Sequence, residues 1–210
     1  MMKKNYTAIG IGLPLTLILA FSIVLHASWV NHVDHFFQQL VHFSPNLQGI
    51  MLKISFLASP KMDLVWMLII VIILWIKHQK PLALNLLVLL ISADAVGWVI
   101  KHLIQRARPI QHLAIDDGFS FPSGHTLGLS ILVLWFIMIF LPVFLKNKTT
   151  RIWVDILLAV ILVIEMISRV YLYAHYPTDV CGSVLVSWTW IGVVELLWQK
   201  FTPRTSKNNF

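Results

Sequence analysis

Charge is scarce in this 210-residue chain. Asp, Glu, Lys and Arg together make up only 12% of the residues, whereas soluble domains average about 25%. Hydrophobic residues account for 58% of the chain, and the mean hydropathy is +0.80. This balance excludes an ordinary soluble globule and indicates a protein of the lipid bilayer. The length suits one domain, so we expect a single membrane domain over residues 1–210.

Cysteine and acidic residues are also scarce. Cys181 is the only cysteine, which rules out a disulfide within the chain and leaves the redox compartment open. The nine acidic residues are outnumbered by sixteen Lys and Arg, which gives a net charge of +7. These cations lie in short segments beside apolar stretches and form no basic stripe interleaved with aromatic residues. They are expected to orient the chain in a membrane, and a nucleic-acid partner is not expected.

Long apolar runs are abundant. Six stretches are long and apolar enough to cross a membrane, at about 8–27, 62–76, 82–101, 125–145, 152–171 and 178–198. The predicted fold class is therefore all-α, an integral membrane bundle of six transmembrane helices. The first run follows Lys3 and Lys4 and is also compatible with a cleavable signal peptide. Its length and the lack of a clear small-x-small site favour an uncleaved span.

The charges of the loops predict the orientation. With the N-terminus inside, the inner segments hold ten Lys and Arg and the outer segments hold six. Three of those six are assigned to chemistry below, which leaves ten against three. Both termini are therefore expected to be cytoplasmic. The longest outer segment, 28–61, has apolar residues at near-helical spacing over about 29–43, which predicts an amphipathic helix in the membrane interface.

Three short segments on the predicted outer side carry the reactive side chains, at 101–109, 121–125 and 168–179. A phosphate group carries charge on several oxygens, so a site that transfers it needs convergent cations. Lys101, Arg108 and Arg169 can supply them, and the planar fork of arginine matches phosphate geometry.

The second segment predicts a helix start that binds an anion. Pro122 and Ser123 precede the fourth span, so the turn formed by residues 123–125 is expected to cap it. Backbone N–H groups at a helix N-terminus bind anions, and Gly124 lets a phosphate approach closely. Pro177 similarly fits the first turn of the sixth span.

Two histidines can divide the labour of phosphoryl transfer. A nucleophilic histidine must be neutral, with its other nitrogen held by a partner, and His175 with Asp179 fits. A leaving alkoxide needs a proton, which His125 can give as a general acid before it deprotonates the attacking water. Taken alone, each of these residues has an ordinary explanation as an interfacial anchor, a loop histidine or a helix cap. Their joint occurrence favours an enzyme.

The motifs Lys-x6-Arg-Pro, Pro-Ser-Gly-His and Ser-Arg-x5-His-x3-Asp occur in this order over residues 101–179. They resemble the three signatures of the type-2 phosphatidic acid phosphatase superfamily without a gap or substitution. The resemblance implies a lipid phosphate phosphatase that needs no metal or cofactor, and the charges of the loops put its site at the outer face. It implies phosphate binding by Lys101, Arg108, Ser123, Gly124 and Arg169. It also implies catalysis by His125 as general acid, His175 as nucleophile and Asp179 as its orienting partner.

Several alternatives stay open. An alcohol in place of water would make the enzyme a phosphotransferase with the same site. A transporter or channel, with Asp94, Glu165 and Glu195 lining a polar path, leaves the three motifs unexplained. A haloperoxidase that uses vanadate is disfavoured for an embedded chain.

The expected partners are membrane lipids and a lipid phosphate substrate, of the phosphatidic acid, phosphatidylglycerophosphate or undecaprenyl pyrophosphate class. The oligomeric state is not predicted, and Asp94, Arg106 and segment 28–61 have no assigned role. Glu165 lies one helical turn before Arg169, so we expect an ion pair between them.

Overall fold

The computed structural model describes residues 2–42, 45–114 and 116–201. No strand occurs among these residues, which confirms the predicted all-α class. The elements are α1 (Met2–Val24), α2 (Ser28–Val41), η1 (Pro45–Leu47), α3 (Gln48–Leu57), α4 (Pro60–Ile76), α5 (Lys80–Ile104), α6 (Gly124–Trp135), the π-helical turn η2 (Phe136–Phe140), α7 (Leu141–Phe144), α8 (Lys148–Tyr171) and α9 (Pro177–Phe201).

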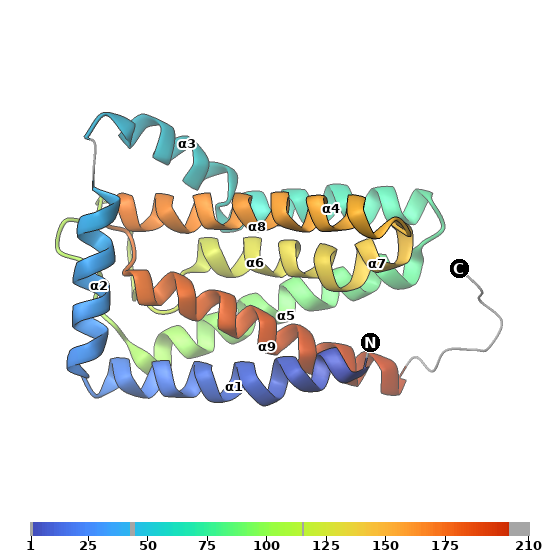
Figure 1. Ribbon diagram of the computed structural model, residues 1–210, viewed down its shortest axis with the longest axis horizontal. Coiled ribbons are helices and arrows are strands. Elements are labelled where there is room, and N and C mark those ends of the chain that lie inside the picture. The colour runs from blue at the N-terminus through green and yellow to red at the C-terminus, as the bar shows by residue number, and fades with distance from the viewer. Residues whose placement is uncertain (1, 43–44, 115, 202–210) are drawn as a thin grey trace.

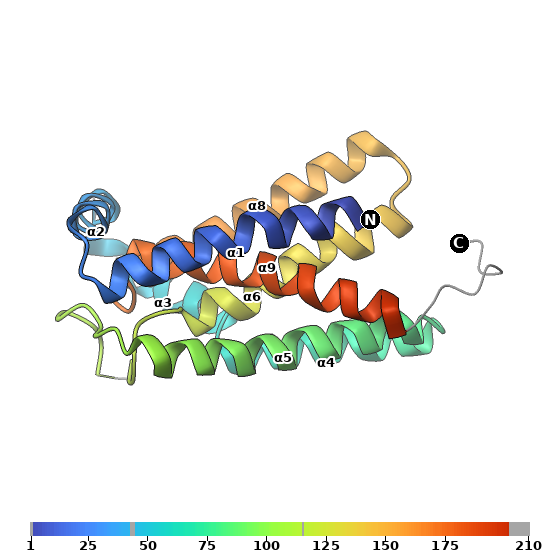
Figure 2. The ribbon, with the colours of Figure 1, turned by 90° about the horizontal axis from the view of Figure 1, so that it is seen from below.

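The long helices lie side by side along the long axis of the molecule, and α2 lies across one end of them (Figure 1). Figure 2 shows α2 end-on at the same end, together with the loop that connects α5 to α6. The start of α1 and the end of α9 lie at the opposite end in both views. The segments that carry the three motifs are therefore gathered at the end of the bundle far from both of these helix termini.

The number of spans is only partly settled by the helices. Within the described part of the chain, four helical stretches are long and apolar enough to cross a membrane: Asn5–Val24, Lys80–Ile104, Gly124–Phe144 and Pro177–Phe201. The pair α3 and α4, bent by 47° at the break between them, adds a fifth. Helix α8 has 24 residues and runs alongside the others, but five of its residues are charged. The six-span layout therefore stays a prediction.

Three helices begin at a polar residue whose side chain accepts a hydrogen bond from a backbone N–H. Ser59 caps α4, Ser123 caps α6 through the N–H of Thr126, and Asn147 caps α8. Such caps satisfy donors that have no partner within the helix. The expected cap of the fourth span is thus confirmed, and α9 begins at Pro177 as predicted.

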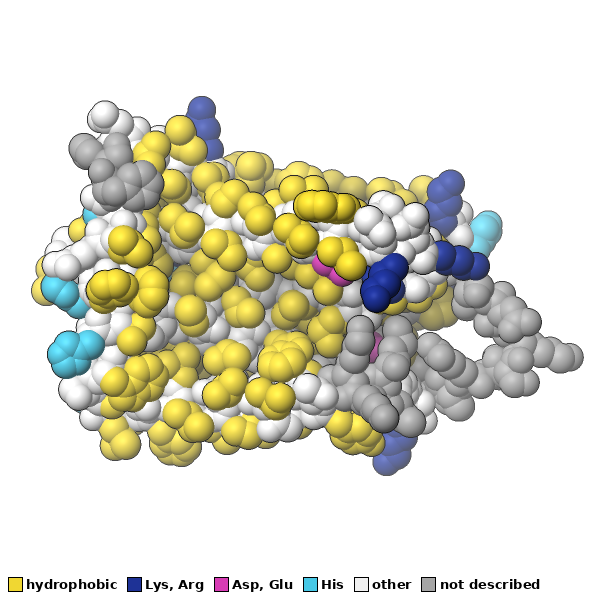
Figure 3. Space-filling view, in the orientation of Figure 1, with side chains coloured by type: hydrophobic (Ala, Val, Ile, Leu, Met, Phe, Trp, Pro, Cys, Tyr) yellow, Lys and Arg dark blue, Asp and Glu magenta, His cyan; other side chains and the backbone are white. Residues whose placement is uncertain are grey.

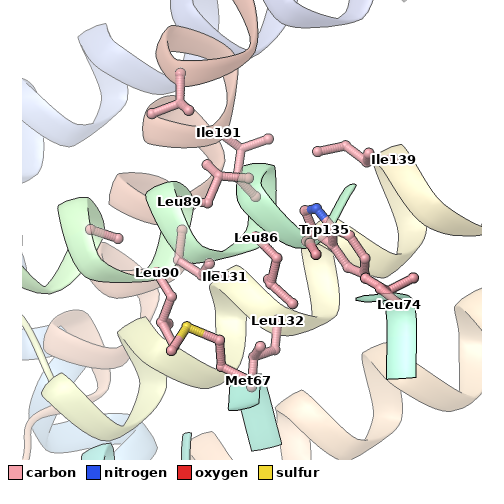
Figure 4. Close-up of a cluster of buried hydrophobic side chains, with 13 residues drawn as sticks. Met67, Leu74, Leu86, Leu89, Leu90, Ile131, Leu132, Trp135, Ile139 and Ile191 are labelled. Atoms are coloured by element: carbon pink, nitrogen blue, oxygen red, sulfur yellow. The ribbon is translucent and has the colours of Figure 1, made fainter. Parts of the chain in front are cut away.

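The centre of the bundle is a hydrophobic cluster shared by α4, α5, α6, η2 and α9 (Figure 4). The side chain of Trp135 is fully buried there, and its Nε1 donates to Asn85 Oδ1 at 2.9 Å. Asn85 in turn donates from Nδ2 to Glu195 Oε1 at 2.7 Å. These three buried polar side chains are therefore paired across α5, α6 and α9.

Large apolar side chains remain exposed along the outer faces of the helices. Figure 3 shows hydrophobic side chains over most of one face, with Lys and Arg gathered toward the end opposite α2. Ile72, Leu157 and Leu103 are more than half exposed. A soluble monomer rarely exposes a continuous apolar surface of this kind, whereas hydrocarbon tails cover it without cost.

The turn before α6 packs directly on α9. The ring of Phe121 is fully buried and lies over Gly182, where a Cβ atom would come within 2.3 Å of the ring. Gly182 lies less than one helical turn beyond Asp179. The absence of a side chain at this position therefore sets how closely two of the motif segments approach each other.

Replacing Gly182 with alanine should destabilise the protein, because the new methyl group would collide with the Phe121 ring. Overpacking of this kind typically costs about 1–3 kcal/mol. Thermal unfolding of the purified protein in detergent measures the effect. The matched control is Gly10→Ala in α1, since no atom lies within 4 Å of the position of a Cβ there. Equal losses of melting temperature in the two variants would contradict this packing.

Candidate active site

All eight predicted site residues lie at the end of the bundle that α2 covers. Lys101 is in the last turn of α5, Arg169 is in the last turn of α8, and Asp179 is in the first turn of α9. The remaining five come from the α5–α6 loop, the start of α6 and the α8–α9 loop: Arg108, Ser123, Gly124, His125 and His175. Helix ends thus gather side chains that are up to 78 residues apart in sequence, from Lys101 to Asp179.

The imidazole of His175 is buried, with 1% of the residue exposed, and its two nitrogens face different groups. Its Nε2 lies 3.2 Å from Nη1 of Arg108. Because an arginine N–H can only donate, Nε2 is the acceptor and the ring proton belongs on Nδ1. The Nδ1 atom lies 3.7 Å from Oδ2 of Asp179. The ring is therefore oriented with its lone pair toward the cations.

A serine that the motifs do not include lies between His175 and Asp179. The gap of 3.7 Å is too long for a direct hydrogen bond. The hydroxyl of Ser120 donates to Oδ2 of Asp179 and lies 3.5 Å from Nδ1 of His175. Asp179 Oδ2 also accepts the backbone N–H of Tyr176 at 2.9 Å. The expected contact of the carboxylate with the imidazole is therefore assisted by a hydroxyl.

The charge state of His175 follows from its surroundings. Burial, together with the charges of Arg169 and Arg108, lowers the pKa of His175 to about 4, although Asp179 opposes this shift. An unperturbed histidine has a pKa of about 6.5. His175 is therefore neutral at neutral pH, which a nucleophile requires.

Arg108 is held by backbone carbonyls on two sides. Its Nε and Nη2 donate to the carbonyl oxygen of Asp117 at 3.0 and 2.7 Å, and its Nη1 donates to that of Ala174 at 2.6 Å. Burial lowers the pKa of Arg108, but a guanidinium stays charged in proteins. The cation beside His175 Nε2 is therefore fixed in place before any substrate binds.

Arg169 is paired differently from the prediction. Its Nη2 lies 2.7 Å from Oδ1 of Asp116, and its Nη1 donates to the hydroxyl of Ser55. Glu165 accepts a hydrogen bond from Thr126 instead, at 3.4 Å. The expected pair between Glu165 and Arg169 is thus wrong, because Arg169 reaches beyond the end of α8 to the α5–α6 loop.

The side chains of Lys101 and His125 make no hydrogen bond with the residues that the structure describes. The charged groups that act on His125 are Arg169, His175, Arg108 and Lys101. Gly124 leaves room beside the turn, since the nearest atom to the position of a Cβ is Pro60 Cγ at 3.6 Å. The hydroxyl of Ser123 is already engaged as the helix cap. An anion that enters here meets three cations, the turn and an unengaged imidazole.

This geometry agrees with a comparison of sequences. The profile of the PAP2 superfamily matches residues 82–203, which is more than half of the chain. The chain belongs to the PAP2 superfamily. The matched region begins in α5 and includes all eight site residues.

Individual relatives of this PAP2 protein are similar over most of their length. Phosphatidylglycerophosphatase B of Bacillus subtilis is 30% identical, over 81% of this chain and 87% of its own. An undecaprenyl-diphosphatase of Sulfolobus acidocaldarius is 28% identical, over 89% of each chain.

Two solved structures are similar to this chain in fold. The PAP2-type phosphatidylglycerolphosphate phosphatase of Bacillus subtilis superposes with a TM-score of 0.77 and 25% identity, over 95% of this chain and 99% of its own. LpxE of Aquifex aeolicus shares the fold, with a TM-score of 0.55 and 18% identity, over 77% of this chain and 93% of its own. The PAP2 protein thus has the helical membrane fold of its family.

Four residues that the sequence reasoning missed complete the site: Ser55, Ser120, Asp116 and Arg106. Arg106 lies inside the first motif but not at one of its defining positions, and it donates to Oδ1 of Asp179 at 2.5 Å. Its own second partner is Asp34 of α2. The sequence contained one indication of this pair, because Asp34 is the only acidic residue before Asp63 and so stands out as a possible partner for a buried cation.

Replacing Ser120 with alanine should lower the turnover number about 10-fold or more, because Asp179 loses a charge-assisted hydrogen bond and the nearest group to His175 Nδ1 is removed. Hydrogen bonds to charged groups are worth about 1.5–3 kcal/mol. Phosphate release under saturating substrate measures the change. Ser130→Ala is the control, since the Ser130 hydroxyl is buried in α6 and has no partner among the described residues. Unchanged turnover for Ser120→Ala would remove the hydroxyl from this role.

Proposed function

We propose that this PAP2 protein is a membrane phosphatase that hydrolyses phosphate monoesters or pyrophosphates of lipids through a phosphohistidine on His175. The observation that carries the proposal is the arrangement of His175, a buried neutral imidazole whose Nε2 faces Arg108 at 3.2 Å. Lys101 and Arg169 lie in the same cluster of charges. The cluster lies at the end of an apolar helical bundle, where a lipid would present its head group.

Binding of the phosphate would use groups that are already in place. The guanidinium of Arg108 is fixed by carbonyl oxygens, and α6 begins at Gly124 with first-turn N–H groups of the kind that bind anions. Donors that are fixed before binding need no reorganisation as charge develops in the transition state. Lys101 has no other partner among the described residues and is free to turn toward the anion. These cations can fill the role that a metal ion takes in other phosphoryl transfer enzymes, and we propose a metal-independent reaction.

The first chemical step would form a bond between Nε2 of His175 and phosphorus while the bond from phosphorus to the leaving oxygen breaks. His125 would give its proton to that oxygen, so the lipid alcohol leaves neutral. In the second step, water would attack the phosphohistidine, and His125 would take the proton of the water. Inorganic phosphate then leaves, and both histidines return to their starting forms.

His125 must carry a proton when the substrate is bound. Burial and the neighbouring cations Arg169, Arg108 and Lys101 oppose a positive charge on His125. A bound phosphate brings negative charge that offsets this repulsion. We therefore propose that the protonated form of His125 develops together with substrate binding, which links acid catalysis to the presence of the anion.

The names of the relatives support the proposed substrate class, and the charges of the loops support the proposed orientation in the membrane. One relative is named a phosphatidylglycerophosphatase and another an undecaprenyl-diphosphatase. Both names describe a terminal phosphate on an apolar tail, the chemistry that we propose for this chain. With α8 as a sixth span, both termini are on the cytoplasmic side, and the site is on the outer face, in keeping with the excess of cations in the inner segments.

Phosphate release from a panel of lipid phosphates in EDTA tests the activity. Purified protein in detergent should release phosphate from phosphatidic acid, phosphatidylglycerophosphate or undecaprenyl pyrophosphate at an undiminished rate in the chelator. Loss of activity in EDTA that magnesium restores would contradict the metal-independent assignment. A panel on which no lipid phosphate is cleaved would remove the function.

The pH dependence of phosphoenzyme formation tests the nucleophile. His175→Ala should abolish the acid-labile phosphoenzyme, whereas the parent should form it. Because burial holds the pKa of His175 at about 4, the neutral form persists as the pH falls through 6.5. The acid limb that belongs to the free nucleophile should therefore lie well below pH 6. Phosphoenzyme in the His175→Ala variant at the parent level would assign the nucleophile elsewhere.

The general acid can be separated from phosphate binding by the choice of leaving group. An alkoxide is a strong base and needs the proton of His125, whereas p-nitrophenolate needs it far less. His125→Ala should slow phosphorylation by a lipid phosphate about 10²–10⁴-fold, but slow phosphorylation by p-nitrophenyl phosphate much less. Rapid-quench measurement of the phosphoenzyme isolates this step from the later attack of water. Equal losses with both substrates would mean that His125 acts mainly in binding.

A further inference from the structure

Arg106 joins the candidate catalytic carboxylate to helix α2. Its Nη1 lies 2.5 Å from Oδ1 of Asp179, and its Nη2 lies 2.5 Å from Oδ2 of Asp34. The side chain of Arg106 is 11% exposed, that of Asp34 is 5% exposed and that of Asp179 is fully buried. Tyr176 covers the guanidinium, with its ring centre 4.2 Å from Cζ. One buried arginine therefore bridges two carboxylates from different helices.

Asp34 also binds the start of α9. Its Oδ1 accepts the backbone N–H of Thr178 at 2.9 Å, and its Oδ2 accepts the Thr178 hydroxyl at 3.0 Å. The N–H groups in the first turn of a helix have no partner within it, and a carboxylate there also offsets the helix dipole. A side chain from α2 therefore caps the helix that carries Asp179.

The two oxygens of Asp179 are thereby given separate partners. Oδ1 is held by Arg106, while Oδ2 receives the Ser120 hydroxyl and the Tyr176 N–H and faces His175. The backbone carbonyl of Arg106 also accepts the N–H of Ser120 at 2.7 Å. A rotation of the carboxyl group would break contacts on both sides at once. Arg106 thus fixes which oxygen is presented to the imidazole.

Helix α2 is anchored on the other side of His175 as well. At its C-terminal end, Nε2 of His42 lies 2.8 Å from the carbonyl oxygen of Tyr171, and the His42 ring stacks on Tyr173 with centroids 4.0 Å apart. The chain around His175 therefore contacts this part of the protein on both sides. Tyr171 and Tyr173, which precede His175, contact His42, and Thr178, which follows it, contacts Asp34.

We propose that Arg106 and Asp34 are positioning residues for the reaction: they hold Asp179 so that its Oδ2 faces Ser120 and His175, and they make helix α2 a part of the active site. Neither residue touches the cation cluster or the reacting atoms, so each acts through Asp179. The inference rests on the proposed function, in which His175 is the nucleophile. Loss of such supporting partners in other sites typically costs about 10–100-fold in activity.

Three variants separate the effect of the positive charge of Arg106 from the effect of its bridging geometry between Asp34 and Asp179. Arg106→Met removes both the charge and the fork. Arg106→Lys keeps one positive charge near Asp179 but cannot bridge two carboxylates. Asp34→Asn leaves Arg106 with Asp179 and removes the cap of α9. The controls are Lys61→Met, an exposed cation at the same end of the bundle, and His32→Asn, an exposed position on α2.

The first readout compares turnover with anion binding in the full-length protein, using vanadate as the probe of the phosphate site. Arg106→Met and Asp34→Asn should lower the turnover number about 10–100-fold and leave the inhibition constant of vanadate within about twofold. The two controls should match the parent in both quantities. A vanadate constant that weakens in step with turnover would make Arg106 a phosphate-binding residue and overturn the proposal.

The second readout is the pH dependence of phosphoenzyme formation. The charged groups around His175 are Asp179, Arg108, Arg169 and His125. Without Arg106, the charge of Asp179 acts on the imidazole without a counter-ion and raises the pKa of His175. The acid limb should then move to higher pH in Arg106→Met and stay near that of the parent in Arg106→Lys. An acid limb that does not move in Arg106→Met would overturn the proposal.

The fraction of folded sites must be known for these comparisons. The amplitude of the phosphoenzyme burst measures the concentration of folded sites. A variant in which only the folded fraction falls therefore loses amplitude but keeps the rate constant and the acid limb of the parent. That result in both Arg106→Met and Asp34→Asn would reduce the link to a stabilising role and refute the inference. A parent enzyme without phosphohistidine at His175 would instead refute the proposed function, whatever the variants do.

Discussion

The end of the bundle that holds the candidate active site depends on burying the carboxylate of Asp179 without leaving its charge unpaired. An isolated buried charge costs several kcal/mol, so each oxygen must find donors. The donors come from the α5–α6 loop, as Arg106 and Ser120, and from the turn before α9, as the N–H of Tyr176. Because Arg106 is itself buried, it needs Asp34, which brings α2 across the end of the bundle. A single carboxylate thereby determines the arrangement of three segments that are distant in sequence.

The same requirement divides the site into groups that are held and groups that are open. Arg108 is engaged by carbonyl oxygens and Arg169 by Asp116, so their positions do not depend on a ligand. Lys101 and His125 have no such partners among the described residues. This division suits phosphoryl transfer, in which fixed donors stabilise the developing charge while a proton donor must move with the reacting group.

The sequence was sufficient for the features that depend on local pattern. Apolar runs located the long helices to within a few residues, and the spacing of the three motifs selected side chains that the fold brings to one end. The partners of those side chains were not predictable in the same way, because Asp34 meets Thr178 across 144 positions and Arg169 meets Asp116 across 53. The expected pair of Glu165 with Arg169 failed for this reason. Neighbours along a helix compete with loop residues that no local pattern reveals.

Helix α8 shows how charged residues near a candidate site make a long helix less apolar. It has 24 residues and α9 has 25, but Glu165 and Arg169 add charge to the third of α8 nearest the candidate site. Lys148, Arg151 and Asp155 add charge to its other end. Glu165 and Arg169 are both buried against other elements, where Thr126 and Asp116 are among their partners. A side chain that faces the interior of a bundle does not meet lipid, so its charge is not a cost of crossing the bilayer. Composition alone therefore does not separate a helix with interior charges from one that faces water, and α8, which carries Arg169 of the candidate site, is such a helix.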